Sequence, residues 1–546
     1  METLRQWCAD LEWIGSSTLL LATPGSPLDL FFVNLADQVG MDVGTIKYVS
    51  LMLAAYPMGY LFSRAPASPS MKHFMSFLGG AWMMQFIFAS QWIHSFITSV
   101  ATYFLVTSLP NRIMPYAVFV FVMGYMCASH TYRMYVDYMG WSLDFTGPQM
   151  VLTMKLTAYA FNVYDGRMLE TLADTGNART DKVKRRRRRC AVVESPGILA
   201  FLGYSLCFST ILAGPTFEFV VYESAVTGRA FTRKDGTKAM PGNVAAALSR
   251  LAVGLACLAF FQALSPLYPL ADVASSEALA LPFYYRFAVT WVTLAICRQK
   301  YYFAWKVAEG GAVMAGHGFE GFNAEGKSTG WGGISNIDIL EFEFAQNLTA
   351  NSRAWNKGTQ SWLERYIYSR SGNSLMAVYF VSAFWHGFYP GYYMFFLSVP
   401  LATCTARAAR MKVRPYFLNA DGSGRGVWKK LYDAASMVVD SVVLCYLVIP
   451  FVLLSWEKSH LVWSSYGYGV HLAIILWYAI CTYVIPKKAR VDAVKTPSRP
   501  SVVKTLSQSP KEGLIQMPLG EGQGKEVAPS RALFTSSSPQ VDKKLQ

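Results

Sequence analysis

The 546-residue chain has little charge for its length. Charged residues make up 15% of it, whereas 53% of the residues are hydrophobic and 15% are aromatic. A soluble globular protein carries about 25% charged residues. This composition excludes an ordinary soluble protein and is typical of a polytopic membrane protein, for which chain length does not predict the number of domains.

Catalytic motifs with a fixed spacing are also missing. The chain has no H-x-x-x-x-D pair, which soluble-type glycerolipid acyltransferases use as acid and base, and no HExxH, GxSxG, Walker A or DHHC motif. Its nine cysteines are scattered, mostly within apolar runs, and form no CxxC pair. We therefore expect neither a disulfide scaffold nor a zinc site, and we assign no metal and no bound cofactor.

Positive charge is concentrated in two places. The formal net charge is +15, and much of it lies in the run Lys182–Arg189 and in the tail from Lys487 onward. In a membrane protein, basic clusters remain on the cytosolic side and contact anionic lipid. We therefore expect both segments in the cytosol, the first within a loop at 164–195, and we expect no binding of nucleic acid.

The tail differs in composition from the rest of the chain. Residues 487–546 are rich in Ser, Pro and Lys and poor in large apolar residues, so we expect a disordered basic tail after a membrane domain at 1–486. The tail ends Lys543-Lys544-Leu545-Gln546, which resembles the dilysine signal that coat proteins read to retrieve membrane proteins to the endoplasmic reticulum. This predicts a multi-pass protein of that membrane with a cytosolic C-terminal tail.

Apolar runs of suitable length predict about eleven membrane spans, each needing about 20 residues or fewer where neighbours bury it. The spans are expected at 45–62, 74–90, 92–108, 113–129, 148–163, 196–214, 244–266, 279–297, 375–400, 436–455 and 465–486. Weaker membrane-associated stretches lie near 27–37 and 299–316. The predicted fold is therefore an all-α polytopic membrane protein with additional short or re-entrant helices.

The distribution of charge constrains the topology. Even numbers of spans separate the 182–189 run, the basic loop at Arg407–Arg414 and the tail, so all three are expected on one side. The segment 298–374, which is rich in Arg and Lys, would then fall on the other side. We expect part of it to re-enter and pack inside the protein, with Asn356 near the cytosolic mouth of a cavity.

Two cations interrupt the predicted spans. Lys155 and Arg286 each lie within an apolar run. Such groups usually face the interior of a bundle or a water-filled cavity. We expect these two side chains to snorkel or to pair with backbone carbonyls.

One histidine stands out among the seven. His386 lies in the apolar stretch SAFWHGFYPGYYMFF (Ser382–Phe396), about 20 Å along a predicted helix. An ionisable ring at that depth is energetically costly and indicates function. Gly387 and Pro390-Gly391 predict a kink or break of the helix one turn later, which would free backbone carbonyls and open a cavity. A neutral imidazole next to a water-accessible break has the properties of a general base.

Asn356 lies in a second unusual stretch, WNKGTQSWLERY (Trp355–Tyr366). Apolar residues repeat at i, i+4 from Trp362, which predicts a helix with Asn356, Thr359 and Leu363 on one side. Asparagine does not titrate, so its role would be to hydrogen-bond, either orienting a substrate or stabilising developing charge. The alternative is that Asn356 caps the helix that follows. The residues leave both interpretations open.

The two stretches together resemble one family. WNKGTQSWLERYIYSR (Trp355–Arg370) followed by SAFWHGFYPGYY (Ser382–Tyr393) is similar to the membrane-bound O-acyltransferases, specifically to their lysophospholipid acyltransferase branch. Segments at 150–167, 201–222 and 336–345 agree with this resemblance. The run Lys182–Arg189 and the tail look peculiar to this chain and inherit no role from it.

The resemblance implies helices around a central chamber, which acyl-CoA enters from the cytosolic side and a lysophospholipid enters from the bilayer. It implies that His386 is the catalytic base and that Asn356 is the second catalytic residue. Substrate-binding residues that shape the chamber would be Trp355, Trp385 and Tyr392. From charge, Arg or Lys side chains of residues 353–370 would meet the phosphates of coenzyme A.

The predicted function is an acyl-CoA-dependent lysophospholipid O-acyltransferase of phospholipid remodelling. It would acylate the free sn-2 hydroxyl of lipids such as lysophosphatidylcholine or lysophosphatidylethanolamine, with acyl-CoA as co-substrate. The alternatives are a member of the same family with another acceptor (diacylglycerol, a sterol or a protein) and a transporter that couples protons through His386. The sequence does not indicate the preferred head group or acyl chain, or the oligomeric state.

Overall fold

The computed structural model describes residues 24–140, 142–419 and 421–486. These residues form helices joined by turns, with isolated β-bridges and no strand among them. The fold is therefore all-α, as predicted. The tail at 487–546, with Lys543-Lys544, lies outside the described residues.

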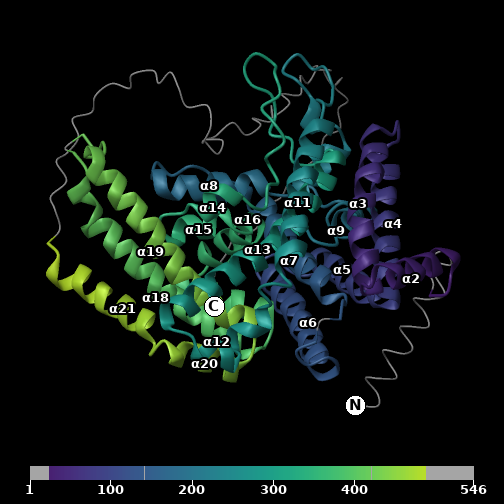
Figure 1. Ribbon diagram of the computed structural model, residues 1–546. Helices are drawn as coiled ribbons and strands as arrows, with labels where there is room; N and C mark the ends of the chain where they lie inside the picture. Colours follow the sequence, from purple (N-terminus) through teal and green to yellow (C-terminus); the bar gives the residue numbers. More distant parts are fainter. Residues whose placement is uncertain (1–23, 141, 420, 487–546) are drawn as a thin grey trace, which may run out of the picture.

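The first part of the described chain contains ten α-helices. They are α2 (Pro27–Val39), α3 (Val43–Arg64), α4 (Pro69–Phe88), α5 (Trp92–Ser108), α6 (Met114–Val136), α7 (Thr146–Arg167), α8 (Ala178–Cys190), α9 (Ile198–Ser205), α10 (Phe219–Val226) and α11 (Val244–Leu264). In Figure 1, α3 and α4 stand at one edge of the molecule, and α8 lies across the ends of other helices.

The second part contributes the remaining helices. They are α12 (Ser276–Ala280), α13 (Phe283–Met314), α14 (Ile339–Glu343), α15 (Leu348–Ala354), α16 (Lys357–Trp362), α17 (Leu375–His386), α18 (Pro390–Lys412), α19 (Gly426–Leu453), α20 (Trp456–Ser465) and α21 (Gly469–Ala479). Two π-helices, η5 (Leu363–Tyr368) and η7 (Ile480–Val484), continue α16 and α21. Figure 1 shows α18, α19 and α21 at the edge opposite α3 and α4, with α13 and the short helices α14 to α16 between them.

The short helices occupy the interior, as expected for a segment that re-enters. Phe342, Ala354 and Trp362, one from α14, one from α15 and one from α16, are all buried. Helix α8 and the turn between α18 and α19 lie at the same edge of the molecule (Figure 1). Residues 407–412 form the end of α18 rather than a loop. That this segment and the 182–189 run share one side of a membrane stays a prediction.

Two predicted spans are not single helices. The 196–214 run forms α9 and then a buried series of turns, and the 375–400 run is divided between α17 and α18. Irregular backbone is tolerated at membrane depth when protein buries it and satisfies its polar groups. Lys155 satisfies such groups where α9 ends, because its ammonium group donates to the carbonyls of Tyr204 and Ser205.

The 279–297 and 299–316 runs form one helix, α13, rather than two elements. The polar residues around Arg298 lower the local hydropathy but do not interrupt the helix. Arg298 donates to both carboxylate oxygens of Glu343 on α14, at 3.0 and 2.8 Å. This partner is far away in the sequence, and so the hydropathy pattern alone predicted a boundary that does not exist.

The predicted number of about eleven spans is not confirmed for the described residues. By length and apolar composition, α11 and α19 are each able to cross a membrane, and α20 together with Gly469–Val484 would make a third span, bent by 68°. The other long helices carry polar groups that neighbouring helices bury. In α7, for example, Lys155, Asn162 and Asp165 are all buried.

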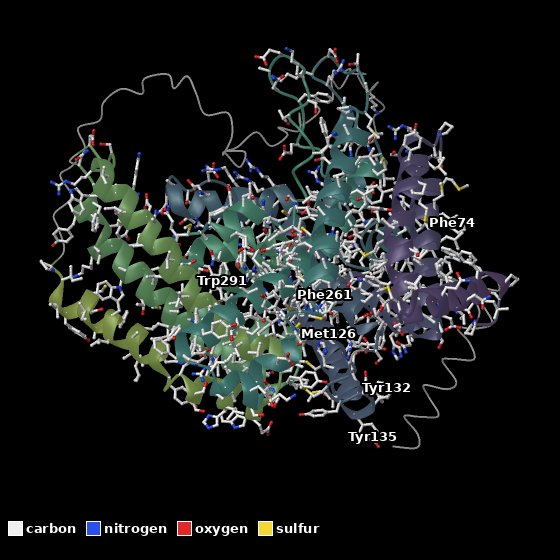
Figure 2. The ribbon with its side chains drawn as sticks, viewed as in Figure 1. Phe74, Met126, Tyr132, Tyr135, Phe261 and Trp291 are labelled. Carbon is white, nitrogen blue, oxygen red and sulfur yellow. The ribbon has the colours of Figure 1, made fainter. Side chains whose placement is uncertain are left out.

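Large apolar side chains project from the outside of the molecule. Phe74 on α4 and Tyr132 and Tyr135 on α6 point away from the neighbouring helices (Figure 2), and Tyr135 is 59% exposed. Broad apolar exposure in a folded protein indicates contact with another apolar phase. The outer surface therefore agrees with a protein surrounded by lipid.

The two interior cations pair with backbone carbonyls, as predicted. Lys155 donates to the last two carbonyls of α9, and Arg286 donates to the carbonyls of Leu279 and Ser465 at 2.6 and 2.8 Å. Both side chains are buried. Each cation therefore ties its helix to a distant segment of the chain.

We predict that Lys155→Met lowers the thermal stability of the detergent-solubilised protein. The substitution keeps the volume but leaves the carbonyls of Tyr204 and Ser205 without this donor, which costs about 1–3 kcal/mol. Lys238→Met, at an exposed position, serves as the control. Equal unfolding midpoints for the two variants would show that the Lys155 contacts do not stabilise the fold.

Candidate active site

A cavity of about 480 Å³ lies between α13, the segment from α14 to η5, and helices α17, α18 and α19. Three of these helices contribute stripes at the i, i+3 and i+4 spacing of one helix face. The stripes are Leu375, Val378, Tyr379, Ser382 and His386 on α17, Phe396, Val399, Thr403 and Arg407 on α18, and Asp440, Leu444, Val448 and Phe451 on α19. The cavity therefore runs along the helices as a shaft.

The shaft changes from polar to apolar along its length. Arg353, Glu364 and Arg407 line it and are exposed, so they mark its mouth. Along α19, Asp440 and Phe451 lie about 16 Å apart by helical rise, with Phe451 beside His386 at the inner end. A ligand with a charged head and an apolar chain matches this gradient.

Helix α17 ends at His386, so the predicted break exists but begins directly after the histidine rather than one turn later. Gly387 has φ 119°, a conformation that L side chains rarely adopt, and Pro390 begins α18 in the first helical turn. The chain therefore breaks between two helices that both line the cavity. His386 is the last residue before the break.

A hydrogen bond determines the tautomer of His386. Its Nδ1 lies 2.7 Å from the carbonyl oxygen of Ser382. A carbonyl only accepts, so Nδ1 carries the proton and the lone pair is on Nε2. Within the described residues, no hydrogen bond to Nε2 is recorded, and the ring lines the cavity. Nε2 is therefore available to take a proton from a ligand.

Aromatic rings hold the imidazole in place. The His386 ring centroid lies 4.7 Å from that of Trp385, 5.0 Å from Phe396, 5.2 Å from Phe451 and 5.5 Å from Tyr392. Contact with rings on several sides leaves the imidazole little freedom to rotate. The position of Nε2 is therefore fixed before any ligand binds.

His130 on α6 supports the helix break from behind. Its Nε2 lies 3.0 Å from the carbonyl oxygen of Trp385, one of the acceptors left without a partner where α17 ends. Its ring also lies so close to Gly387 that an added Cβ would be 3.3 Å from it. Sequence reasoning missed this residue, because nothing in its local sequence indicates a partner 255 positions away.

Asn356 caps a helix and also lines the cavity, so its catalytic role stays a prediction. It has φ 41° and ψ 57° and caps α16, because its side-chain oxygen accepts from the backbone N–H of Thr359 at 3.4 Å. It also lines the cavity, together with Thr359 and Leu363, as the predicted helix face required. Since Oδ1 is the capping atom, the amide Nδ2 remains a donor for a ligand.

The three aromatic candidates divide into two groups. Trp355 lines the cavity, as expected. Trp385 and Tyr392 are absent from the wall and instead pack against the His386 ring. Trp385 is also fixed by its indole N–H, which donates to the carbonyl of Met150 at 3.0 Å. The assignment of all three as residues that shape the chamber stays a prediction, and Trp385 and Tyr392 would act through the His386 ring.

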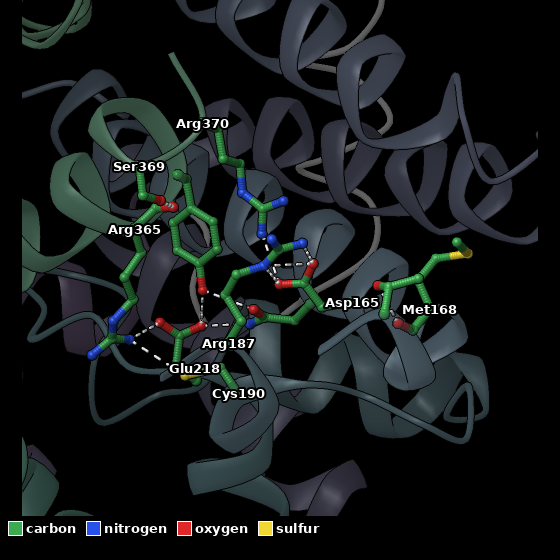
Figure 3. A network of polar contacts seen from close by, with 11 residues as sticks. Asp165, Met168, Arg187, Cys190, Glu218, Arg365, Ser369 and Arg370 are labelled. Atoms are coloured by element: carbon green, nitrogen blue, oxygen red, sulfur yellow. Dashed lines mark hydrogen bonds and ion pairs between the residues drawn. The ribbon is translucent and has the colours of Figure 1, made fainter. Parts of the chain in front are cut away.

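Most cations of residues 353–370 point away from the cavity. Figure 3 shows Arg365 directed at Glu218 and Arg370 directed at Asp165, with contacts of 2.5 and 2.7 Å. Only Arg353, among the Arg and Lys residues of this segment, lines the cavity. Arg407 from α18 is a lining cation that the sequence did not single out.

The network in Figure 3 holds the π-helix that forms one wall of the cavity. Glu218 also accepts from the Tyr366 hydroxyl at 2.8 Å and from the Asn162 amide at 2.6 Å. Asp165, which is 1% exposed, accepts from both Arg187 and Arg370. The outward side chains of η5 are thus fixed, while its Leu363 and Glu364 face the cavity.

The family of the chain follows from this site and from its relatives. Residues 131–449 match MBOAT, the membrane-bound O-acyltransferase family. This match spans more than half of the chain, and the chain belongs to that family. It is therefore a multi-pass membrane protein and an O-acyltransferase by family.

Individual relatives cover nearly the whole chain. A protein of Schizosaccharomyces pombe described as "Lysophospholipid acyltransferase" is 31% identical over 507 residues, which span 88% of this chain and 96% of the relative. A protein of Gallus gallus described as "Membrane-bound glycerophospholipid O-acyltransferase 2" is 32% identical over 83% of this chain and 88% of the relative. A Saccharomyces cerevisiae "Lysophospholipid acyltransferase" is 28% identical over 82% and 76%, respectively.

We predict that Asp165→Asn lowers the free energy of unfolding by about 3–5 kcal/mol, because it leaves two arginines beside a buried position without their counter-charge. The matched control is Asp174→Asn. Asp174 also pairs with two arginines, Arg185 and Arg188, but its side chain is 46% exposed, so the loss should stay below about 1 kcal/mol. Unfolding of the purified variants, followed by fluorescence, measures both. Similar losses of unfolding free energy in the two variants would show that burial of the carboxylate does not determine the cost.

Proposed function

We propose that the chain is an acyl-CoA-dependent lysophospholipid O-acyltransferase of phospholipid remodelling. It esterifies the free sn-2 hydroxyl of lysophospholipids such as lysophosphatidylcholine or lysophosphatidylethanolamine. The observation that carries this proposal is that His386, with Nε2 free, and Asn356, with its amide free, line one cavity. The descriptions of the relatives support the same substrate class.

His386 is the general base in this reaction. Its Nε2 takes the proton of the glycerol hydroxyl as the hydroxyl oxygen attacks the carbonyl carbon of the thioester. Its Nδ1–H stays bonded to the Ser382 carbonyl, which stabilises the positive charge that the ring gains. The ring then returns the proton to the sulfur of the departing coenzyme A.

Asn356 stabilises the charge that develops on the thioester oxygen. Its Nδ2 donates a hydrogen bond to that oxygen while Oδ1 remains bonded to the Thr359 N–H. The carbon–sulfur bond breaks as the new ester bond is completed, so coenzyme A leaves as the thiol. Because the hydroxyl attacks the thioester directly, no acyl-enzyme forms.

The polar mouth of the shaft suits the phosphates of acyl-CoA, and its apolar inner part suits the acyl chain. Arg353 and Arg407 at the mouth meet the phosphates of coenzyme A, and the pantetheine arm follows the shaft inward. Trp355 lies on the wall beside Asn356. The acceptor enters from the bilayer, so that its hydroxyl reaches Nε2 of His386.

The same proposal includes the cellular setting. The mouth opens to the cytosol, where the 164–195 loop and the 487–546 tail also lie. The membrane domain at 1–486 crosses the endoplasmic reticulum membrane about eleven times around the central chamber. The dilysine Lys543-Lys544 then serves for retrieval by coat proteins.

Reconstituted protein supplied with radiolabelled acyl-CoA and a panel of lysophospholipids tests this function. We expect labelled phospholipid whose formation depends on both substrates. Labelled product from diacylglycerol, a sterol or a protein instead would assign another acceptor. Flux of a solute without any ester product would replace the enzyme with a transporter.

We predict that His386→Ala abolishes turnover while the protein remains folded, because the proposed mechanism assigns the hydroxyl proton to this ring. The rate of phospholipid formation and the unfolding midpoint measure the two effects. Activity close to that of the wild type would remove His386 from the mechanism.

We predict that Asn356→Asp lowers the rate at least 10²-fold without a loss of stability. Aspartate caps a helix as well as asparagine does, but it cannot donate to a developing oxyanion. Asn356→Ala should lose both the rate and part of the stability. If Asn356→Asp retained most of the activity, Asn356 would be a cap and nothing more.

A further inference from the structure

The inner face of α8 is fully engaged with the rest of the protein. Lys184 donates to the carbonyl of Ala173 at 2.9 Å, and Arg188 donates to the carbonyl of Leu172 at 2.7 Å. Arg187 pairs with the buried carboxylate of Asp165. These contacts fix the orientation of a helix that carries the basic run of the sequence.

The outer face of α8 is cationic and exposed. Lys182, Arg185, Arg186 and Arg189 follow one another at helical spacing and are all exposed. Within the described residues, Lys182 and Arg189 have no recorded hydrogen bond or ion pair. The acid of this helix, Asp181, is buried and accepts from the backbone and hydroxyl of Thr175. Of the four exposed cations, Arg185 pairs with Asp174 and Arg186 with Glu364, so Lys182 and Arg189 keep their full charge.

Helix α8 has a peripheral position in the molecule (Figure 1). The helix lies across the ends of other helices, at the same edge as the turn between α18 and α19 (Figure 1). Val183, on α8, and Val193, just after it, are 38% and 62% exposed. A helix with cations and apolar side chains exposed together is typical of the boundary between water and lipid.

The outer face is also separate from the cavity. No residue of α8 lines the cavity, whose own cations at the mouth are Arg353 and Arg407. Arg186 connects the outer face of α8 to the cavity, because it pairs at 2.7 Å with Glu364 at the mouth. Lys182 and Arg189 span about 10 Å along the helix, which suits several phosphates in a plane better than one soluble ligand.

We propose that α8 is a lipid-binding surface, whose outer cations bind the head groups of anionic phospholipids in the adjacent leaflet. This binding anchors the 164–195 segment at the bilayer next to the cavity mouth. It does not depend on the acyl transfer reaction, so it can be tested whether or not the protein turns over a substrate.

The test variant is Lys182→Gln/Arg185→Gln/Arg189→Gln, which removes the exposed Arg185–Asp174 pair but leaves the inner contacts of α8 and the Arg186 pair intact. The matched control, Arg233→Gln/Lys234→Gln/Lys238→Gln, removes the same charge from another exposed segment. Each full-length protein is reconstituted in phosphatidylcholine vesicles with 30% phosphatidylserine, extracted and purified. Mass spectrometry then gives the ratio of phosphatidylserine to phosphatidylcholine that each protein retains.

We expect this ratio to fall at least about tenfold in the α8 variant and to stay near the wild-type value in the control. The charge-conserving variant Arg185→Lys/Arg189→Lys should retain phosphatidylserine, and its unfolding midpoint and that of the triple variant should match the wild type. Equal ratios for the α8 variant and the wild type, or equal losses in the α8 variant and the control, would overturn the proposal.

A separate arm distinguishes the two sources of phosphate. In vesicles of phosphatidylcholine alone, we expect the α8 variant to keep the wild-type KM for acyl-CoA. A large rise in that KM together with unchanged retention of phosphatidylserine would show that the cations serve the acyl donor, and it would overturn the assignment to lipid.

Discussion

The site depends on how the chain satisfies its backbone where α17 stops inside the protein. A helix that ends in the interior leaves carbonyl groups without partners, and each of these is costly unless a donor is supplied. Here Gly387 N–H donates to Ala383, and His130 contacts the carbonyl of Trp385. His386 itself donates to the carbonyl of Ser382. This bond, made one turn back within α17, leaves Nε2 of His386 as an acceptor facing the cavity.

The wall of the cavity that carries Asn356 is held in place by ion pairs. Asn356 lies in a left-handed conformation at the start of α16, and the π-helix η5 continues from there. Both features are uncommon and are found at functional sites because the surrounding structure must maintain them. The carboxylates of Glu218 and Asp165 do this by binding Arg365 and Arg370 from behind. The wall is therefore fixed without using cations that face the cavity.

Features that depend on local sequence were predictable. The break beside His386 follows from Gly387 and Pro390, and the pairing of Lys155 with carbonyls follows from the cost of a buried cation. Features that depend on partners far away in the sequence were not predictable. His130 has no local signature, and Arg298 within α13 pairs with Glu343, which lies 45 positions away. Counting apolar runs predicted more spans than the length and apolar composition of the described helices support. Helices such as α7 contain polar groups that other helices bury, and the sequence does not show which helices those are.

The central claim is that His386 and Asn356 act on the same thioester from two sides of one cavity. The direct measurement is a cryo-EM structure of the protein with acyl-CoA and a lysophospholipid analogue that lacks the sn-2 hydroxyl, so that no reaction occurs. The account predicts the thioester oxygen at hydrogen-bonding distance, about 3 Å, from Asn356 Nδ2, and the sn-2 carbon of the analogue next to His386 Nε2. A thioester bound away from both side chains, or contacted by only one of them, would contradict it.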